Sequence, residues 1–439
     1  MPEKVDKKLK ILILSDYGYI EGGTGKVAIS SALRLAEIGH EVVYFSAVGP
    51  VSEDLLNSRI KNVICIGQKD ILFNPNKIDA ILSGTYNWRA VKRLEKLFKE
   101  WIPDVAHIHG ITKALSWAAI NEIYKQKIPV VFTLHDYGLL CPNLGAHNFK
   151  TDKSCDLYKP GCEFKCLVTN CDKRRYLHKL WRWIRFHFSM NVLKVNKKIK
   201  GYVAVSNFMK SFFKEYIPED KTVRVIYSPV NMASCEHLEN SNEKFKGLPT
   251  FLFLGRLSYE KGLDLALEAI SGLNARLLIV GDGELKEYCK KKAREIGTIN
   301  GLDKVEFLGW KSEEEIIKEM NRCWAIVLPS RVKESGGLVI LEAAKYSLPA
   351  IVSESGAFTE FVNNQEDGYY CKPCDAESLM KSMENVINNP QKTKLMGESA
   401  RKKFLEIGVS VEKHTIGLEK FYNEVIEDQK QHLLSKRFI

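Results

Sequence analysis

Short runs of apolar, mostly β-branched residues recur along the chain, and a stretch with helical spacing follows each of them. Six runs precede residue 230 and five follow residue 249: KILILS, EVVYFS, VAHIHG, VVFTLH, YVAVS and VRVIY, then TFLFLG, RLLIVG, VEFLG, WAIVLP and PAIVS. Apolar strands that alternate with helices are typical of parallel sheets covered by helices. The pattern predicts an α/β protein with two Rossmann-like parallel-sheet domains facing a cleft.

The polar, aperiodic segment SPVNMASCEHLENSNEKFKGLP at 228–249 separates the two groups of runs. Helical periodicity returns after residue 410 without a partner strand. We therefore expect an N-terminal domain at 1–230, a linker at 231–249 and a C-terminal domain at 250–410. A final helix at 411–439 is expected to pack outside one domain or across both.

Composition narrows the class of protein. The chain has 439 residues, of which 45% are hydrophobic and 27% charged, and this is ordinary for a multidomain globular protein. The apolar runs are shorter than the roughly 18–20 residues that cross a bilayer, and the lysine-rich start lacks a signal-peptide core, so we expect a cytoplasmic protein. The net charge of +11 favours an anionic partner, which could be a nucleic acid, a phosphorylated substrate or a membrane surface.

Two glycine-rich turns follow predicted strands but complete neither of the common nucleotide motifs. In GGTGK at 22–26, Ile20 stands where the phosphate loop needs its first glycine, and Val27 stands where it needs Ser or Thr. In the GDGE turn, Lys286 replaces the last glycine of GxGxxG, which disfavours a nicotinamide or flavin cofactor. The first turn either lets an anionic or hydroxyl-rich ligand approach the backbone near Gly23 or serves helix packing.

Charged residues cluster after two strands of the second half. Arg256 and Lys261 follow TFLFLG, and they could neutralise a diphosphate without a metal or form an ordinary solvated surface. Glu334 and Glu342 enclose seven residues, with two glycines between a strand and a helix. This spacing leaves Glu334 on the loop, directs amides near Leu338 toward a phosphate and puts Glu342 about one turn into the helix.

Taken in order, GGTGK, HIHG, TLHDY, GR with EKG, VGDGE, VEFLGW, LPSRVKESGGLVILEA and SGAFTEFV cover almost the whole chain. This combination resembles the retaining nucleotide-sugar glycosyltransferases of family 4, which have the GT-B fold. The resemblance implies sugar transfer from a nucleotide-diphosphate donor to a glycan or lipid-linked acceptor, in surface polysaccharide or glycolipid assembly. It also implies catalysis that needs no metal cofactor, because side-chain cations and helix-terminal amides hold the leaving phosphate.

The resemblance also assigns roles to residues. Glu334 is expected to contact the transferred sugar near the reacting carbon, His135 to reach that sugar from the N-terminal domain, and Glu342 to bind the donor ribose. Two positions depart from the family pattern, with Gly336 in place of an aromatic residue and Ser347 in place of a glycine. The remaining expected donor contacts are Gly23, Arg256, Lys261, Gly309, Trp310, Ser335, Gly336, Gly337 and Leu338.

Other functions remain as alternatives at this point. A GT-B epimerase or hydrolase of nucleotide sugars would share the donor site but would not need an acceptor. A zinc-containing dehydrogenase would combine α/β domains with histidines and cysteines, but the missing GxGxxG counts against it. No nucleic acid partner is expected, because no recognised binding motif accompanies the positive charge.

A cysteine-rich insertion at about 141–171 stands apart from the rest of the sequence. Its five thiols lie within 31 residues and suggest a structural zinc site, with buried thiols or a disulfide as the alternatives. Four of the five would hold the metal: Cys141, Cys155, Cys162, Cys166 and Cys171.

The segment 173–214 holds twelve Lys or Arg residues and no Asp or Glu. Within it, helical spacing places Leu177, Leu180, Trp181, Ile184 and Phe188 on one face, with Arg175, His178, Arg182 and Arg185 on a neighbouring ridge and Trp183 and Phe186 interleaved. The apolar face could pack into the domain and leave the basic ridge in solvent. Alternatively, the segment holds the enzyme peripherally on an anionic membrane surface.

Overall fold

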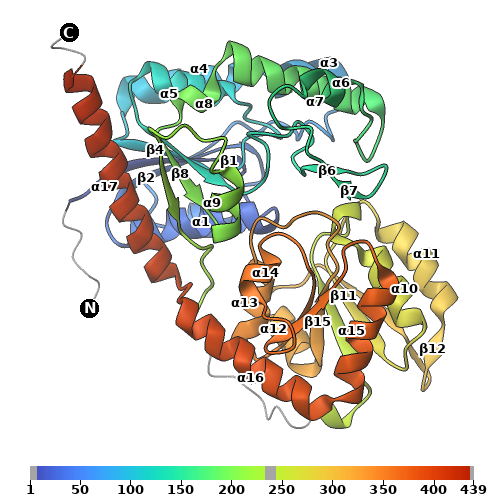
Figure 1. Cartoon of the computed structure of the whole chain (residues 1–439). Helices are drawn as coiled ribbons and strands as arrows, with labels where there is room; N and C mark the ends of the chain where they lie inside the picture. Colours follow the sequence, from blue (N-terminus) through green and yellow to red (C-terminus); the bar gives the residue numbers. More distant parts are fainter. Residues whose placement is uncertain (1–6, 233–243, 436–439) are drawn as a thin grey trace. The chain divides into compact units, whose positions relative to one another are not determined.

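The computed structural model describes residues 7–232 and 244–435, and the chain divides into two compact units (Figure 1). The first unit comprises Met1–Thr151, Cys155–Pro229 and Ser410–Ile439, and the second comprises Asp152–Ser154 and Val230–Val409. Residues 233–243 of the expected linker lie outside the described residues. The two parallel-sheet α/β domains predicted from the apolar runs are confirmed.

The first unit is built on a seven-stranded parallel sheet in the order β3-β2-β1-β4-β5-β8-β9. Its central strands are buried on both faces, which explains their uninterrupted apolar sequences. The strands are β1 (Lys10–Tyr17), β2 (Glu41–Val48), β3 (Asn62–Cys65), β4 (Val105–Ile108), β5 (Val130–Leu134), β8 (Gly201–Ala204) and β9 (Thr222–Val225).

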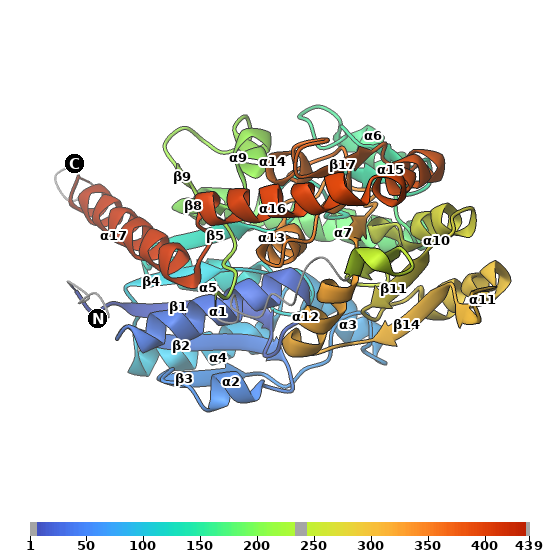
Figure 2. The ribbon, with the colours of Figure 1, turned by 90° about the horizontal axis from the view of Figure 1, so that it is seen from below.

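Helices cover both faces of this sheet (Figure 1 and Figure 2). One face packs on α1 (Gly22–Glu37) and the long helix α17 (Val411–Ser435), which buries Phe421 and Tyr422. Residues of α4, α5, α8 and α9 fill the core against the other face. The further helices of this unit are α2 (Glu53–Leu56), α3 (Lys77–Thr85), α4 (Trp88–Glu100), α5 (Ala118–Lys125), α6 (Glu163–Val168), α7 (Tyr176–His187), α8 (Val195–Lys198) and α9 (Asn207–Phe213).

The second unit has a six-stranded parallel sheet in the order β14-β11-β10-β15-β16-β17. Its strands are β10 (Thr250–Leu254), β11 (Arg276–Val280), β14 (Val305–Gly309), β15 (Ala325–Leu328), β16 (Ala350–Ser353) and β17 (Gly368–Cys371). Its helices are α10 (Leu263–Ser271), α11 (Lys286–Ile296), α12 (Glu313–Arg322), α13 (Leu338–Lys345), α14 (Phe358–Phe361), α15 (Ala376–Asn388) and α16 (Pro390–Ile407).

Both sheets reverse their strand order beside the first strand of the unit, between β1 and β4 and between β10 and β15. Ligands of open α/β sheets bind beyond the carboxyl ends of the strands at such a reversal. The fold therefore singles out the loops that follow β1, β4, β10 and β15.

Helix α7 differs from the face assignment made from its sequence. Leu177 and Ile184 are exposed, whereas Lys179 and Arg185 are buried. Arg185 donates a hydrogen bond to the Thr112 carbonyl at 2.6 Å and stacks on Trp181, and these contacts offset the burial of its charge. Of the two interpretations of this helix, the one in which its whole apolar face packs into the domain does not hold for Leu177 and Ile184, because a backbone carbonyl and an aromatic ring accommodate the basic Arg185 instead.

Across residues 7–232 and 244–435, no helix combines the length and apolar character that a membrane crossing requires.

Candidate functional site

The second unit places charged side chains at the reversal between β10 and β15. Lys261 follows β10, and Nζ of Lys261 donates a hydrogen bond to Oε1 of Glu334 at 2.8 Å. Oγ of Ser330, which follows β15, donates to the same oxygen at 2.5 Å. The Glu334 side chain is only 13% exposed, so its orientation is fixed by two donors in a largely desolvated position.

Close backbone contacts hold these two loops together. Gly262 has φ +69°, and a Cβ at this position would lie 2.1 Å from the Pro329 carbonyl oxygen, so only glycine lets the Lys261 turn approach the end of β15. On the other side, the amide of Ala357 donates to the Glu334 carbonyl at 2.8 Å. The Glu334 loop is therefore fixed by neighbours on both flanks.

Arg331 is a structural residue of this site that the sequence analysis missed. Its guanidinium makes a bidentate pair with Asp264 at 2.7 and 2.8 Å and donates to the Tyr259 carbonyl at 3.1 Å. Since Arg331 lies in the β15 loop and Asp264 in α10, the pair ties the loop of Glu334 to the helix that begins two residues after Lys261. The sequence shows the basic residue within PSRVKE, but it does not show its partner 67 positions away.

The other expected donor contacts occupy several loops of this unit. Arg256 is half exposed, and its guanidinium lies 3.6 Å from a Glu260 carboxylate oxygen, so it is available to an anion. Trp310 is exposed directly after Gly309 at the end of β14. Ser335 and Gly336 lead into α13, with Gly337 at its N-cap, Leu338 at its first position and Glu342 about one turn further along.

The first unit carries His135 and Gly23. His135 follows β5, and its Nε2 lies 3.0 Å from Nδ1 of His109, which follows β4. Burial lowers the pKa of His135 to about 3 and that of His109 well below its usual value, so both rings are neutral near pH 7. Gly23 lies in the first turn of α1. His135 can therefore offer an uncharged donor or acceptor to a hydroxyl group.

Two further histidines belong to the same buried row. His107 on β4 contacts the Tyr422 hydroxyl and the Thr133 hydroxyl, each at 2.6 Å. His414 on α17 donates to the Tyr227 carbonyl at 2.8 Å. Burial lowers the pKa of His107 well below its usual value and that of His414 to about 4. These contacts join α17 to the strands that carry the site.

A cavity of about 460 Å³ lies beyond the ends of β1, β2 and β3 in the first unit. Tyr17, Tyr19 and Phe73 supply aromatic surface, and Glu21 and Asp70 supply carboxyl groups. The Tyr17 hydroxyl donates to Asp70, so that carboxylate is already oriented. Aromatic surface with fixed polar groups is typical of sites for small polar ligands, including sugars.

The cysteine-rich segment gives no support to the predicted zinc site. In the described part of the chain, no group of three or more His, Cys, Asp or Glu side chains is placed to hold a metal. The Asn143 amide lies between Cys141 and Cys171, at 3.0 and 3.3 Å from their sulfur atoms. Burial raises the pKa of Cys141 to about 12 and that of Cys171 to about 11, which favours neutral thiols. The other thiols of the segment, Cys155, Cys162 and Cys166, are also free.

Comparison with known proteins identifies the family. The Glycosyltransferase Family 4 model matches residues 21–234, and the model for Glycosyl transferases group 1 matches residues 236–403. The fold is that of the GT-B glycosyltransferases. Anabaena HepE, solved with UDP and glucose, has a TM-score of 0.66 at 17% identity, over 95% of this chain and all of that one. The chain belongs to glycosyltransferase family 4.

Individual relatives differ in how much of the chain they match. O-antigen chain mannosyltransferase C of Escherichia coli is 29% identical over 240 residues, which are 54% of this chain and 62% of that protein. The chain spans about three fifths of the length of the curated relatives that it matches first. N-acetyl-alpha-D-glucosaminyl L-malate synthase of Bacillus anthracis is 24% identical over 420 residues, covering 93% of this chain and 96% of that enzyme.

Proposed function

We propose that this protein transfers a sugar from a nucleotide-diphosphate donor to a glycan or lipid-linked acceptor, with retention of the anomeric configuration. The observation that carries the proposal is the Lys261–Glu334 pair, fixed by Ser330 at the β10/β15 reversal. A cation beside an oriented carboxylate suits a donor whose diphosphate adjoins a hydroxyl-rich sugar.

The chemistry follows from the charges that the reaction creates. The bond between the sugar's anomeric carbon and the diphosphate oxygen breaks, leaving negative charge on the diphosphate and positive character on the sugar. Arg256, Lys261 and the first amides of α13 stabilise that negative charge, so the step needs no divalent cation. The acceptor oxygen bonds to the same face of the sugar, and its proton passes to the departing phosphate oxygen. Glu334 then acts by positioning the sugar and stabilising its positive charge.

The first unit would supply the acceptor side. Neutral His135 can hydrogen-bond a sugar hydroxyl, and the cavity beyond β1, β2 and β3 offers aromatic and carboxyl groups to an acceptor sugar. One relative is named an O-antigen chain mannosyltransferase, and this likeness supports a role in surface polysaccharide or glycolipid assembly. An enzyme with a lipid-linked acceptor would work peripherally on a membrane.

A thermal-shift screen with UDP-, GDP- and ADP-sugars tests donor binding, because a ligand that binds the native state raises its melting temperature. We expect one nucleotide class to stabilise the protein and Arg256→Ala to abolish that shift. Lys286→Ala, which removes another cation of the same unit that is paired with Asp282, is the matched control. No shift with any donor, or an unchanged shift in Arg256→Ala, would contradict the proposal. Product formation that does not require an acceptor would favour the epimerase or hydrolase alternative.

A further inference from the structure

Helix α3 in the first unit buries only small residues, Ala80, Ser83 and Gly84, and leaves its three large apolar side chains in solvent. Ser83 is buried and Asp79 is partly buried, whereas Ile78 and Leu82 are 73% and 61% exposed and Ile81 is also exposed. A surface helix ordinarily buries its apolar stripe. The inverted pattern therefore indicates that the outer face of α3 has another partner.

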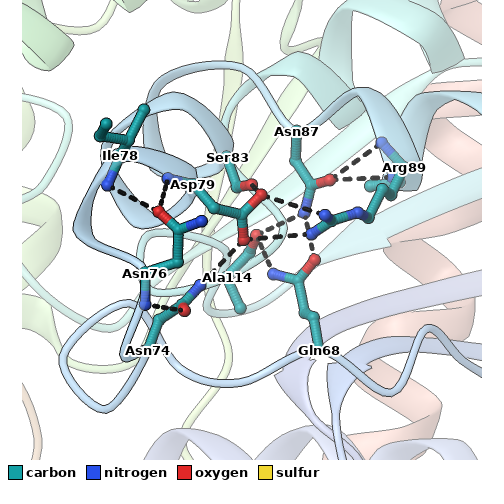
Figure 3. Close-up of polar contacts among 10 residues, drawn as sticks. Gln68, Asn74, Asn76, Ile78, Asp79, Ser83, Asn87, Arg89 and Ala114 are labelled. Carbon is teal, nitrogen blue, oxygen red and sulfur yellow. Dashed lines mark hydrogen bonds and ion pairs between the residues drawn. The ribbon is translucent and has the colours of Figure 1, made fainter.

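A polar network holds α3 in this orientation (Figure 3). The Asn76 side chain caps the helix by accepting from the amides of Ile78 and Asp79 at 3.1 and 3.0 Å. Asp79 accepts from Asn74 at 2.9 Å and pairs with Arg89 at 3.0 Å. Since the part-buried Asp79 contacts fix the rotation of α3, the exposure of the apolar side chains is built into the fold.

Helix α7 extends the apolar surface. Gly84 near the end of α3 packs on Trp181 of α7 so closely that a Cβ there would lie 2.7 Å from the indole ring. Leu177 and Ile184 lie one turn on either side of Trp181 and are exposed. Phe73, in the loop before α3, is exposed as well. We call these six residues the apolar patch: Phe73, Ile78, Ile81, Leu82, Leu177 and Ile184.

Exposed cations stand beside the patch residues in the sequence of α3 and α7, and a further one lies on α4. Lys77 on α3, Lys92 on α4 and Arg175 at the start of α7 are exposed, and residues 173–214 contain no acidic side chain. Trp88, also exposed, lies beneath the Lys92 ammonium at 5.0 Å from its ring centroid. A second copy of this chain would bring like charges together, whereas an anionic lipid surface offers the opposite charge and an apolar interior.

We propose that the apolar patch docks the protein on an anionic lipid bilayer, with its apolar side chains among the acyl chains and the exposed cations at the headgroups. Phe73 belongs to the patch and also lines the cavity beyond β1, β2 and β3. Through this shared residue the sugar of a lipid-linked acceptor enters the cavity while its lipid stays in the membrane beside Phe73. The identity of the acceptor rests on the proposed function.

The test is sedimentation of the full chain with vesicles of phosphatidylcholine, with or without 30% phosphatidylglycerol. We expect binding to the anionic vesicles that weakens with salt and falls at least about tenfold when Ile78, Ile81 and Leu82 are all replaced by Ser. The matched control replaces three exposed leucines of the second unit by Ser: Leu302, Leu395 and Leu405. This control should bind like the parent.

Circular dichroism and melting temperature verify that both triple variants fold. Absence of parent binding at low salt, or equal binding by the α3 variant, would overturn the proposal. So would a parent dimer in light scattering that the α3 variant dissociates, because a second copy would then cover the patch. The sedimentation assay contains neither donor nor acceptor. A negative result for vesicle binding can therefore be distinguished from a negative result in the donor screen.

Discussion

The row of buried histidines in the first unit makes its stability depend on pH. The pKa of His414 is lowered to about 4 and that of His135 to about 3, and the pKa values of His107 and His109 are also lowered, in each case chiefly by burial. The unfolded chain regains an ordinary histidine pKa near 6.5 and binds more protons than the folded chain below that pH. Stability is therefore complete above about pH 6.5 and falls as the pH decreases.

The size of the effect follows from these differences. Lowering the pH from 7.5 to 5.5 decreases the free energy of unfolding by about 1.4 kcal/mol for each of the four histidines. The four together account for a decrease of about 5.5 kcal/mol. Asp16 acts in the opposite direction, because burial raises its pKa to about 6 despite three backbone amides that donate to it. Protonation of Asp16 in the folded state offsets about 1 kcal/mol of this loss in unfolding free energy. Burial also raises the pKa of Asp136, and protonation of Asp136 adds to the offset. The net loss should be about 4 kcal/mol.

Urea unfolding at both pH values, with pulse labelling of buried thiols, resolves the two units. Cys141 and Cys171 report on the first unit, and Cys289, Cys323 and Cys371 report on the second. Residues 244–409 contain no histidine, so the second unit should show much less dependence on pH over this range. An equal pH dependence in both units, or a loss below about 1 kcal/mol in the first, would refute the reasoning.

Single substitutions test the cause. His414→Gln removes one titrating ring and should reduce the loss in the first unit by about 1.4 kcal/mol. His432→Gln changes an exposed histidine of the same helix and is the matched control for the substitution itself.

Three further predictions concern the site and the packing. Glu334→Gln keeps the side-chain volume but removes the charge beside Lys261, so turnover should fall about 100-fold or more while the melting temperature changes little; near-parent turnover would refute the assignment. EDTA should leave initial transfer rates unchanged, and recovery of a chelated, folded enzyme by magnesium or manganese would contradict metal-independent catalysis. Gly201→Ala should destabilise the first unit by about 1–3 kcal/mol in urea unfolding, because the added Cβ would lie 2.7 Å from the Phe421 ring. Gly417→Ala is its control, since its Cβ meets Ile226 at an ordinary 3.4 Å, and equal effects of the two would argue against the packing explanation.

The apolar runs of the sequence were sufficient to predict the strands that are buried on both faces of the two sheets. All eleven apolar runs form strands, and nine of these are central strands, whose coverage on both faces needs continuous apolar sequence; the other two, β9 and β14, lie at sheet edges. The strands β3 and β17 were not predicted. Each is four residues long and lies at one edge of its sheet, but the opposite edge strands β9 and β14 were predicted, so edge position alone does not explain the difference.

For the candidate site, motif spacing located Lys261 and Glu334 but did not reveal the contacts that hold them. The Arg331–Asp264 pair joins two elements through a tertiary contact, and no local pattern encodes it. Helix α7 shows the same limit. Its periodicity was clear, but the burial of Arg185 depends on the Thr112 carbonyl, which lies 73 positions away. Which face of an amphipathic helix is buried is decided by such partners.

The position of α17 has a consequence for how the chain folds during synthesis. Its residues pack into the first unit, yet about 180 residues of the second unit are translated before them. The contact of His107 with Tyr422 therefore cannot form until Tyr422 is translated, 315 positions later, which takes roughly 15–60 s at ordinary rates of translation. During that interval the second unit can fold as a complete body while one face of the first sheet lacks the side chains of Phe421 and Tyr422. The order of folding should thus run opposite to the order of synthesis, with the unit that emerges first completed last.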